Sequence, residues 1–159
     1  MSRIMNLWEK LSPKPMGKWI FGKIVCRNVP YFSTIKPRFE EFRPGFSRVS
    51  MKKRRAVENH IATVHAIAAC NLAECGAGTL MEASLPPSMR WLPKSMYVQY
   101  LKKCETDLTA ECTADDLGEG VARDVNVNVN VNVNVKDTSG NIVVHAEITM
   151  YVSPGKKIP

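Results

Sequence analysis

Residues 59–74 read Asn-His-Ile-Ala-Thr-Val-His-Ala-Ile-Ala-Ala-Cys-Asn-Leu-Ala-Glu, and they open the most apolar part of the chain. From residue 66 to residue 80, the only strongly polar side chains are Asn71, Glu74 and Thr79. A helix that is apolar on nearly every face is buried all round rather than along one stripe. This stretch therefore predicts a central helix that the rest of the fold encloses.

The flanking sequence predicts what encloses that helix. We expect the helix to run from about Thr63 to Gly76 or Gly78, because glycine commonly ends a helix. A hairpin precedes it, with strands over residues 31–41 and 46–51. Further strands follow it, over residues 80–85, 94–104, 106–114, 121–136 and 141–152. One buried helix among antiparallel strands predicts an α+β fold, in which a curved antiparallel sheet wraps around the central helix.

The domain organisation predicted from the sequence is simple. The 159 residues are enough for one domain with its own core. We expect an N-terminal helical extension over residues 1–30, broken at Pro13 and Pro15, because proline interrupts a helix. A single domain over residues 31–159 follows it.

Residues 125–135 form a repeat in which valine holds every odd position and asparagine every even one. In a strand, this period of two places all valines on one sheet face and all asparagines on the other. The valine face must be packed, because asparagine disfavours strands. We interpret the asparagines as an exposed sheet face, with a ladder for binding as the alternative. A two-residue slip preserves the pattern, so the repeat alone does not fix the register.

The composition limits the class of protein. Hydrophobic residues make up 45% of the chain and charged residues 23%, as in ordinary globular proteins. No apolar run reaches the ~18–20 residues that a membrane span needs, and the first ten residues lack the apolar core of a signal peptide. The five cysteines show no C-x-x-C spacing and the three histidines are not clustered. We therefore expect no disulfide framework, no metal site, no cofactor and a cytoplasmic, reducing location.

The formal net charge of +7 indicates attraction to polyanions, which include nucleic acid, acidic lipid and the phosphates of a nucleotide. The densest cluster of cations is at residues 52–55. Four consecutive cations are typical of a solvated turn, and no aromatic residues interleave them as in a nucleic-acid-binding motif. We therefore expect no nucleic-acid partner.

Glu74 is the candidate functional residue of the apolar stretch. A carboxylate on a buried helix is costly unless it is paired, protonated or used in chemistry. The structural interpretation is an ion pair with one of the many lysines or arginines. The functional interpretation is a reactive carboxylate, and the residue type alone leaves both open.

The residues around Glu74 resemble a known family. Members carry an Asn, a Gly three residues on, then His-Gly-Gly, and an acidic residue at the tenth position counted from that His. The series here is Asn59, Ala62, His65-Ala66-Ile67 and Glu74, with the same spacing. This motif makes the chain similar to the hotdog-fold thioesterases, in particular the phenylacetyl-CoA thioesterase-like branch. Residues 90–94 and 98–102 are similar to a largely uncharacterised subgroup of it.

The resemblance implies a hotdog fold and the hydrolysis of an acyl or aryl thioester of coenzyme A. Glu74 would act as general base or nucleophile. The backbone N–H of Ala66 or Ile67 would form the oxyanion hole, together with the positive end of the helix dipole. Asn59 would position water or the carbonyl, and His65 would order the turn. Ala66 and Ile67 replace two glycines of the family, and they lack the conformational freedom of glycine.

Coenzyme A would enter only as part of the substrate. Basic residues near the mouth of the site would hold its phosphates, and a buried asparagine would add a polar contact. The candidate substrate-binding residues are Asn71, Arg54, Arg55, Arg90, Lys94 and Lys102.

The spacing of His65 and Glu74 indicates a dimer. Nine residues of helix place them on opposite faces and ~13 Å apart along the axis, so both cannot reach one carbon atom in the same chain. Two antiparallel helices from two subunits bring the start of one helix beside the middle of the other. This arrangement gives two equivalent sites at an isologous interface, and it agrees with the dimer or tetramer that the resemblance implies.

Three alternatives remain at this point. A hotdog protein that binds acyl-CoA or fatty acyl groups without hydrolysis is favoured by the replaced glycines. A hotdog hydratase or dehydratase is disfavoured, because the chain lacks the proline-rich His motif of that group. A nucleic-acid-binding module depends on net charge alone.

Overall fold

The computed structural model describes residues 2–114, 117 and 127–155. Three α-helices lie in these residues: α1 (Arg3–Leu11), α2 (Gly17–Asn28) and α3 (Ala66–Ser84). The strands are β1 (Arg38–Arg43), β2 (Phe46–Met51), β3 (Met89–Tyr100), β4 (Leu108–Ala114), β5 (Val127–Lys136) and β6 (Ile142–Pro154). Two 3-10 helices, η1 (Pro30–Thr34) and η2 (Arg55–Val57), flank the hairpin of β1 and β2.

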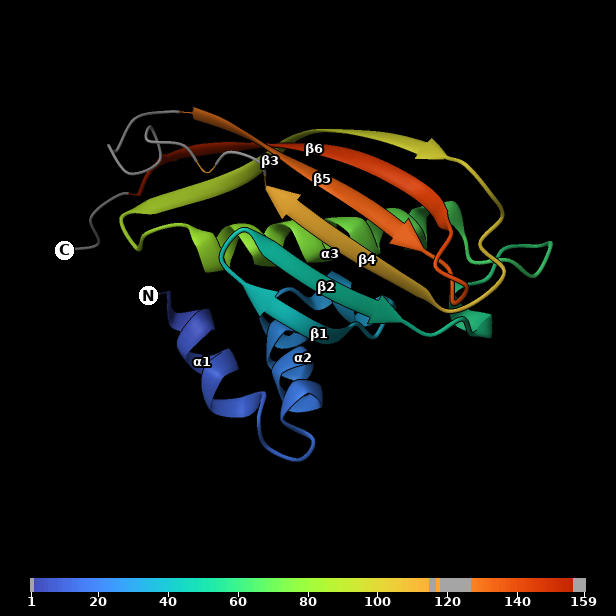
Figure 1. Cartoon of the computed structure of the whole chain (residues 1–159), viewed down its shortest axis with the longest axis horizontal. Helices are drawn as coiled ribbons and strands as arrows, with labels where there is room; N and C mark the ends of the chain where they lie inside the picture. The colour runs from blue at the N-terminus through green and yellow to red at the C-terminus, as the bar shows by residue number, and fades with distance from the viewer. Residues whose placement is uncertain (1, 115–116, 118–126, 156–159) are drawn as a thin grey trace.

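The described strands form one antiparallel sheet in the order β1-β2-β4-β5-β6-β3. The sheet curves around α3, which lies along its concave face (Figure 1). Twelve residues of α3 are buried, and they pack on the inward-facing residues of the strands in one hydrophobic core. This is the hotdog fold, and it confirms the predicted α+β architecture.

The central helix is longer than the sequence predicts. It continues through Gly76 and Gly78 to Ser84, so the strand expected over residues 80–85 is wrong. A Cβ atom on Gly76 would lie 2.5 Å from the Cys112 Sγ, and one on Gly78 would lie 2.7 Å from the Trp91 ring. Both glycines therefore serve close packing against the sheet. The helix ends where prolines follow, because the residue before a proline avoids the helical conformation.

The N-terminal helices form as predicted, with Pro13 and Pro15 between them. Trp8 of α1 and Phe21 of α2 pack edge to face at 5.0 Å between ring centroids. Phe21 continues to Phe39 of β1, also at 5.0 Å. The N-terminal extension is thus joined to the hotdog core by an aromatic cluster. No helix among the described residues is long and apolar enough to cross a membrane.

The Val-Asn repeat forms a strand where the structure describes it. The valines of β5 from position 129 onward are buried, and the asparagines are exposed or half-buried. Both neighbouring strands pair with β5 in a defined register. The first part of the predicted strand, residues 121–126, lies outside the described residues.

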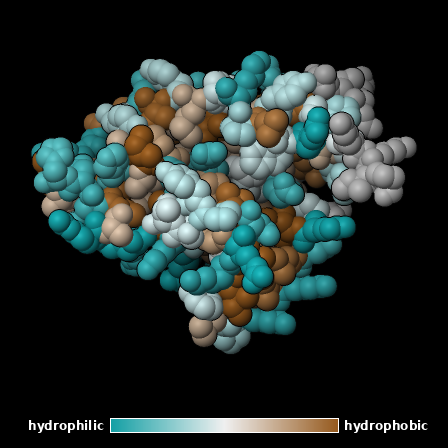
Figure 2. Space-filling model, turned by 180° about the vertical axis from the view of Figure 1, so that it is seen from behind, coloured by the Kyte–Doolittle hydropathy of each residue, from teal (hydrophilic) through white to brown (hydrophobic). Residues whose placement is uncertain are grey.

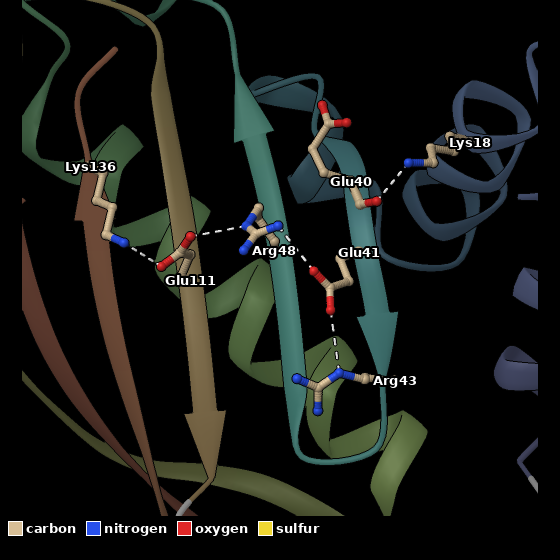
Figure 3. A network of polar contacts seen from close by, with 7 residues as sticks. All are labelled: Lys18, Glu40, Glu41, Arg43, Arg48, Glu111 and Lys136. Carbon is tan, nitrogen blue, oxygen red and sulfur yellow. Dashed lines mark hydrogen bonds and ion pairs between the residues drawn. The ribbon is translucent and has the colours of Figure 1, made fainter. Parts of the chain in front are cut away.

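A chain of ion pairs crosses the outer face of the sheet. Glu111 of β4 accepts hydrogen bonds from Lys136 of β5 and from Arg48 of β2, the latter at 3.0 Å. Arg48 continues to Glu41 of β1 at 3.0 Å, and Glu41 also pairs with Arg43 (Figure 3). This outer face is polar, whereas the inner face is apolar.

Candidate functional site

A cleft of about 580 Å³ lies between the N-terminal helices and the edge formed by α3 and β3. Its walls are mainly aliphatic, with Ile4 and Leu7 from α1, Ile24 and Val25 from α2, Val29 directly after α2, and Leu92 from β3. The volume is in the range of ~300–1,000 Å³ that is usual for small-molecule sites. The cleft is therefore large enough for a substrate group.

Glu74 lines this cleft from the middle of α3, and its side chain is half-buried. Among the described residues, no lysine, arginine or histidine forms an ion pair with it. The structural interpretation of Glu74, a salt bridge, is thus not found in the described part of the chain. The carboxylate instead meets an apolar cleft.

Glu82, two turns further along α3, lines the same cleft but has a partner. Its Oε2 accepts a hydrogen bond from the Trp91 Nε1–H at 3.0 Å. The Trp91 ring lies against Gly78, where only the absence of a side chain leaves room for it. The hydroxyl of Thr79 donates to the carbonyls of Cys75 and Gly76, at 2.7 and 3.0 Å. The Thr79 hydroxyl and the Trp91 N–H are therefore satisfied within the protein.

A second, smaller cavity of about 240 Å³ lies at the start of α3. His65, Ile67 and Ala68 line it, opposite Tyr31 and Thr34 of η1. The His65 Nδ1 accepts a hydrogen bond from the Ile67 N–H at 3.1 Å, so His65 caps the helix as well as ordering the turn. The first turn of a helix carries partial positive charge, and this cavity lies beside it.

The N–H groups of Ala66 and Ile67 differ in their partners. The Ile67 N–H is held by His65, whereas the Ala66 N–H has no hydrogen-bond partner in the residues that the structure describes. An oxyanion at the helix start would thus meet the Ala66 N–H first. The Ile67 N–H would become available only after His65 turned away.

Asn59 holds the loop that leads into α3. Its Oδ1 accepts hydrogen bonds from the backbone of Ile61 and Thr63 at 3.1 Å, and its Nδ2 donates to the Thr63 Oγ1 at 2.8 Å. Ala62 stands where the similar family has glycine, and it has a positive φ of 58°. The loop thus keeps the left-handed conformation that favours glycine, and in this structure Asn59 stabilises it.

Asn71 and Arg54 meet at Thr34. The Asn71 Nδ2 donates to the Thr34 Oγ1 at 3.0 Å, and the Arg54 guanidinium donates to the Thr34 carbonyl. Asn71 is only 5% exposed, and it lines the smaller cavity. Its Oδ1 and the Arg54 Nε are buried without a hydrogen-bond partner in the described residues. Asn71 is only three residues before Glu74 on α3, but it lines the smaller cavity, whereas Glu74 lines the larger cleft.

The other predicted cations do not gather in one place. Arg90 and Lys94 lie in the first half of β3, and the Arg90 Nε donates to the Ser153 Oγ at 3.2 Å. Lys102 lies beyond the opposite end of β3, and Arg55 begins η2. One chain therefore does not bring the predicted cations together into a single phosphate site. The binding of coenzyme A phosphates by these cations stays a prediction, because the predicted site lies between two chains.

The walls of the larger cleft were not predicted as functional from the sequence. In α1, Met5 and Trp8 are buried in the core, while Ile4 and Leu7 line the cleft. The helix thus carries two apolar stripes, one more than packing on a single surface requires. This double pattern is the signal in the sequence that could have indicated the cleft.

The chain is similar to one protein family and to several solved structures. The family described as "Domain of unknown function (DUF4442)" matches residues 17–152. The crystal structure of a structural-genomics target, APC5556, is 39% identical, with a TM-score of 0.78, and the match covers 96% of this chain and 97% of that chain. None of the curated proteins compared matches the chain.

Two structures from Pseudomonas aeruginosa are similar at lower identity. PA5026, described as a protein of unknown function and "Probable Thioesterase", is 20% identical, with a TM-score of 0.75 and coverage of 83% of this chain and 92% of that chain. A mutant of the thioesterase PA1618 is 18% identical, with a TM-score of 0.72 and coverage of 84% and 94%. At these identities, the likeness shows the shared hotdog fold.

Proposed function

Since the chain belongs to the family described as a domain of unknown function, DUF4442, and has the hotdog fold, we propose that it hydrolyses acyl-CoA thioesters. One observation carries the proposal. Glu74 presents a carboxylate to an apolar cleft of substrate size and has no ionic partner in the described residues. The thioesterases among proteins of the same fold support the choice of reaction.

The proposed enzyme is a dimer that pairs through β3. This strand of 12 residues is at the edge of the sheet and is mostly exposed. A long exposed edge strand invites pairing with another chain. Leu92, Tyr97 and Tyr100 on it are 63%, 59% and 54% exposed, and Ile67 on the neighbouring face of α3 is 54% exposed. A second copy of the chain, related by a two-fold axis, would cover these apolar side chains.

Such a dimer would also complete the site. In one chain, His65 and Glu74 lie nine residues apart on α3, so the helix start and the carboxylate face different cavities. With the two copies of α3 antiparallel across the interface, the start of one helix would lie beside Glu74 of the other. Each site would then combine a carboxylate with a helix N-terminus.

In the proposed mechanism, the thioester carbonyl points at the start of α3. The Ala66 N–H and the helix dipole stabilise the negative charge that develops on the carbonyl oxygen. Glu74 of the other subunit accepts a proton from water as the water attacks the carbonyl carbon. The C–S bond then breaks, and Glu74 returns the proton to the sulfur, so that coenzyme A leaves as the thiol. Direct attack by Glu74, through an anhydride that water hydrolyses, is the variant of this route.

Four of the other predicted residues take supporting roles in the proposal. Asn59 and His65 hold the loop and first turn that present the Ala66 N–H. Asn71 and Arg54 lie at the same end of the helix, where the coenzyme A arm would enter. All five cysteines are free, and we therefore place the enzyme in the reducing cytoplasm.

The test measures thiol release from a panel of acyl-CoA and aryl-CoA substrates. We expect Glu74→Gln to lower kcat/KM by ~10²–10⁴-fold, the usual range for the loss of a general base. Glu82→Gln is the matched control, because Glu82 lines the same cleft but is bonded to Trp91. Full activity in Glu74→Gln, or no turnover of any substrate by the unaltered protein, would reject the proposal.

A second candidate is an acyl-CoA-binding protein without hydrolysis. The hydrogen bond from the Ile67 N–H to His65 favours it, because this N–H is not free to bind an oxyanion. In that case, acyl-CoA would bind with measurable affinity and remain intact after prolonged incubation. Mass spectrometry of the bound ligand separates the two candidates.

A further inference from the structure

We propose that the N-terminal helices α1 and α2 form one wall of a chamber for a saturated acyl chain of about eight to ten carbons. The chain would run along α3 from Glu74 to Glu82. This inference rests on the proposed function for the position of the thioester, but chain binding can be measured without hydrolysis. Figure 2 shows hydrophobic side chains gathered on the lower part of the molecule, where Figure 1 places the two N-terminal helices.

The length of the chamber follows from the helix. Glu74 and Glu82 both line the cleft, and eight residues of α-helix span ~12 Å. With carbon–carbon bonds of about 1.5 Å and bond angles of about 111°, each carbon advances an extended alkyl chain by about 1.25 Å. A chain of about nine or ten carbons therefore spans the distance between the two carboxylates.

The chemistry of the walls favours an alkyl chain. Ile4, Leu7 and Ile24 contribute flexible aliphatic side chains to the cleft. The polar groups between the two carboxylates need no ligand, because Thr79 bonds to its own helix and the Trp91 N–H bonds to Glu82. A ligand with hydrogen-bonding groups would find few partners along this wall.

The pair of Trp91 and Glu82 marks the far end of the chamber, where the Glu82 side chain is exposed. Gly78 lets the Trp91 ring lie directly on α3, and the hydrogen bond to Glu82 fixes its position. Arg3 of α1 also lines the cleft, so α1 contributes one charged side chain to the lining and α3 contributes another, Glu82. An alkyl chain that reached beyond Glu82 would leave the aliphatic walls, and added carbons would gain little binding energy.

The experiment uses S-alkyl-coenzyme A thioethers, which cannot be hydrolysed, with alkyl chains of 4 to 16 carbons. Calorimetry on the full chain gives the Kd of each. We expect each added carbon to lower the Kd about fourfold, the value that corresponds to ~0.8 kcal/mol per buried CH₂. This gain should stop at about ten carbons.

Leu7→Phe adds a larger side chain on α1 and narrows the chamber. We expect the Kd of this variant to stop falling at about eight carbons. Leu11→Phe is the matched control, because Leu11 is on the same helix, packs against the core and does not line the cleft. A Kd that does not depend on chain length would overturn the inference. The same holds for a Leu7→Phe profile equal to that of the unaltered protein.

The two proposals fail in different ways. If the thioethers show the expected dependence on chain length but no acyl-CoA is hydrolysed, the chamber stands and the thioesterase proposal fails. If acyl-CoAs are hydrolysed but thioether binding does not vary with chain length, the thioesterase stands and the chamber is wrong.

Discussion

Two glutamates on opposite faces of this fold show how surroundings decide what a carboxylate does. Glu111, on the outer face of the sheet, lies between Lys136 and Arg48. The hydrogen bond from Lys136, followed by that from Arg48, lowers the pKa of Glu111 despite its partial burial. Glu74, on the central helix, faces an apolar cleft with no such partner in the described residues. The first carboxylate stabilises the sheet through ion pairs, whereas the second is the one that we propose as the general base.

The most direct test of this difference places a cationic side chain beside Glu74, as Lys136 and Arg48 lie beside Glu111. Cys70→Lys places an ammonium group one helical turn before Glu74, where residues four apart are neighbours. A nearby cation stabilises the charged carboxylate and makes it a weaker base. We expect acyl-CoA hydrolysis to fall at least tenfold, measured as kcat/KM.

Cys70→Met is the matched control, because it also removes the contact of 3.2 Å between the Cys70 Sγ and the Tyr100 hydroxyl but adds no charge. We expect it to keep most of the activity. Equal losses in both variants would show that size or the Tyr100 contact matters rather than charge.

The apolar stretch around Glu74 and the strand patterns that flank it were enough to predict the α+β architecture. A run that is apolar on every face demands enclosure, and the strands that follow have the period of two that a sheet needs. The end of α3 was predicted wrongly, because glycine at positions 76 and 78 can serve two purposes. It commonly ends helices, but it also permits close contact, and only the positions of Cys112 and Trp91 decide between them.

The candidate site was predictable only where its residues share one element. His65 and Glu74 could be related through the geometry of α3 alone. Arg55 and Arg90 could not, because they lie in two elements, η2 and β3, whose relative position depends on the whole fold. The chamber required α1, α3 and β3 to be placed together, which no local pattern specifies.

The second variant removes the negative charge of Glu111, the carboxylate that forms ion pairs on the sheet. Glu111→Gln leaves Lys136 and Arg48 without their shared partner on a partly buried surface. We expect the free energy of unfolding to fall by ~1 kcal/mol, between the values for exposed pairs and for charged hydrogen bonds. Activity should not change, because β4 presents Glu111 to the outer face. Urea denaturation and thiol release measure the two effects, with the exposed Glu105→Gln as control.

Comparison of the unaltered protein with Glu111→Gln also predicts how stability depends on pH. The pKa of Glu111 is lowered in the folded state, so its stabilising contribution is present above the unfolded-state pKa of ~4.3 and is lost as the pH falls through the lower folded value. The difference in urea midpoint between the unaltered protein and Glu111→Gln should therefore be largest near pH 7 and should shrink as the pH falls below the unfolded-state pKa. A difference that grew on acidification would contradict this assignment. Other carboxylates titrate in both proteins and cancel in the comparison.

The smallest effect concerns the asparagines of the repeat, which share the outer face with Glu111. Asn128 of β5 is exposed and pairs in register with Tyr151 of β6. Threonine is favoured in strands and asparagine is depleted, on a scale that spans ~1 kcal/mol. Asn128→Thr should therefore raise the free energy of unfolding by a few tenths of a kcal/mol, measured by urea denaturation, with Asn128→Gly as the opposite control. If Asn128→Thr lowered stability or activity instead, the asparagine side chain itself would be needed. The outer face would then have a role beyond exposure to solvent. An unchanged acyl-CoA profile with slightly higher stability would confine the chemistry of this fold to the side of the sheet that holds Glu74.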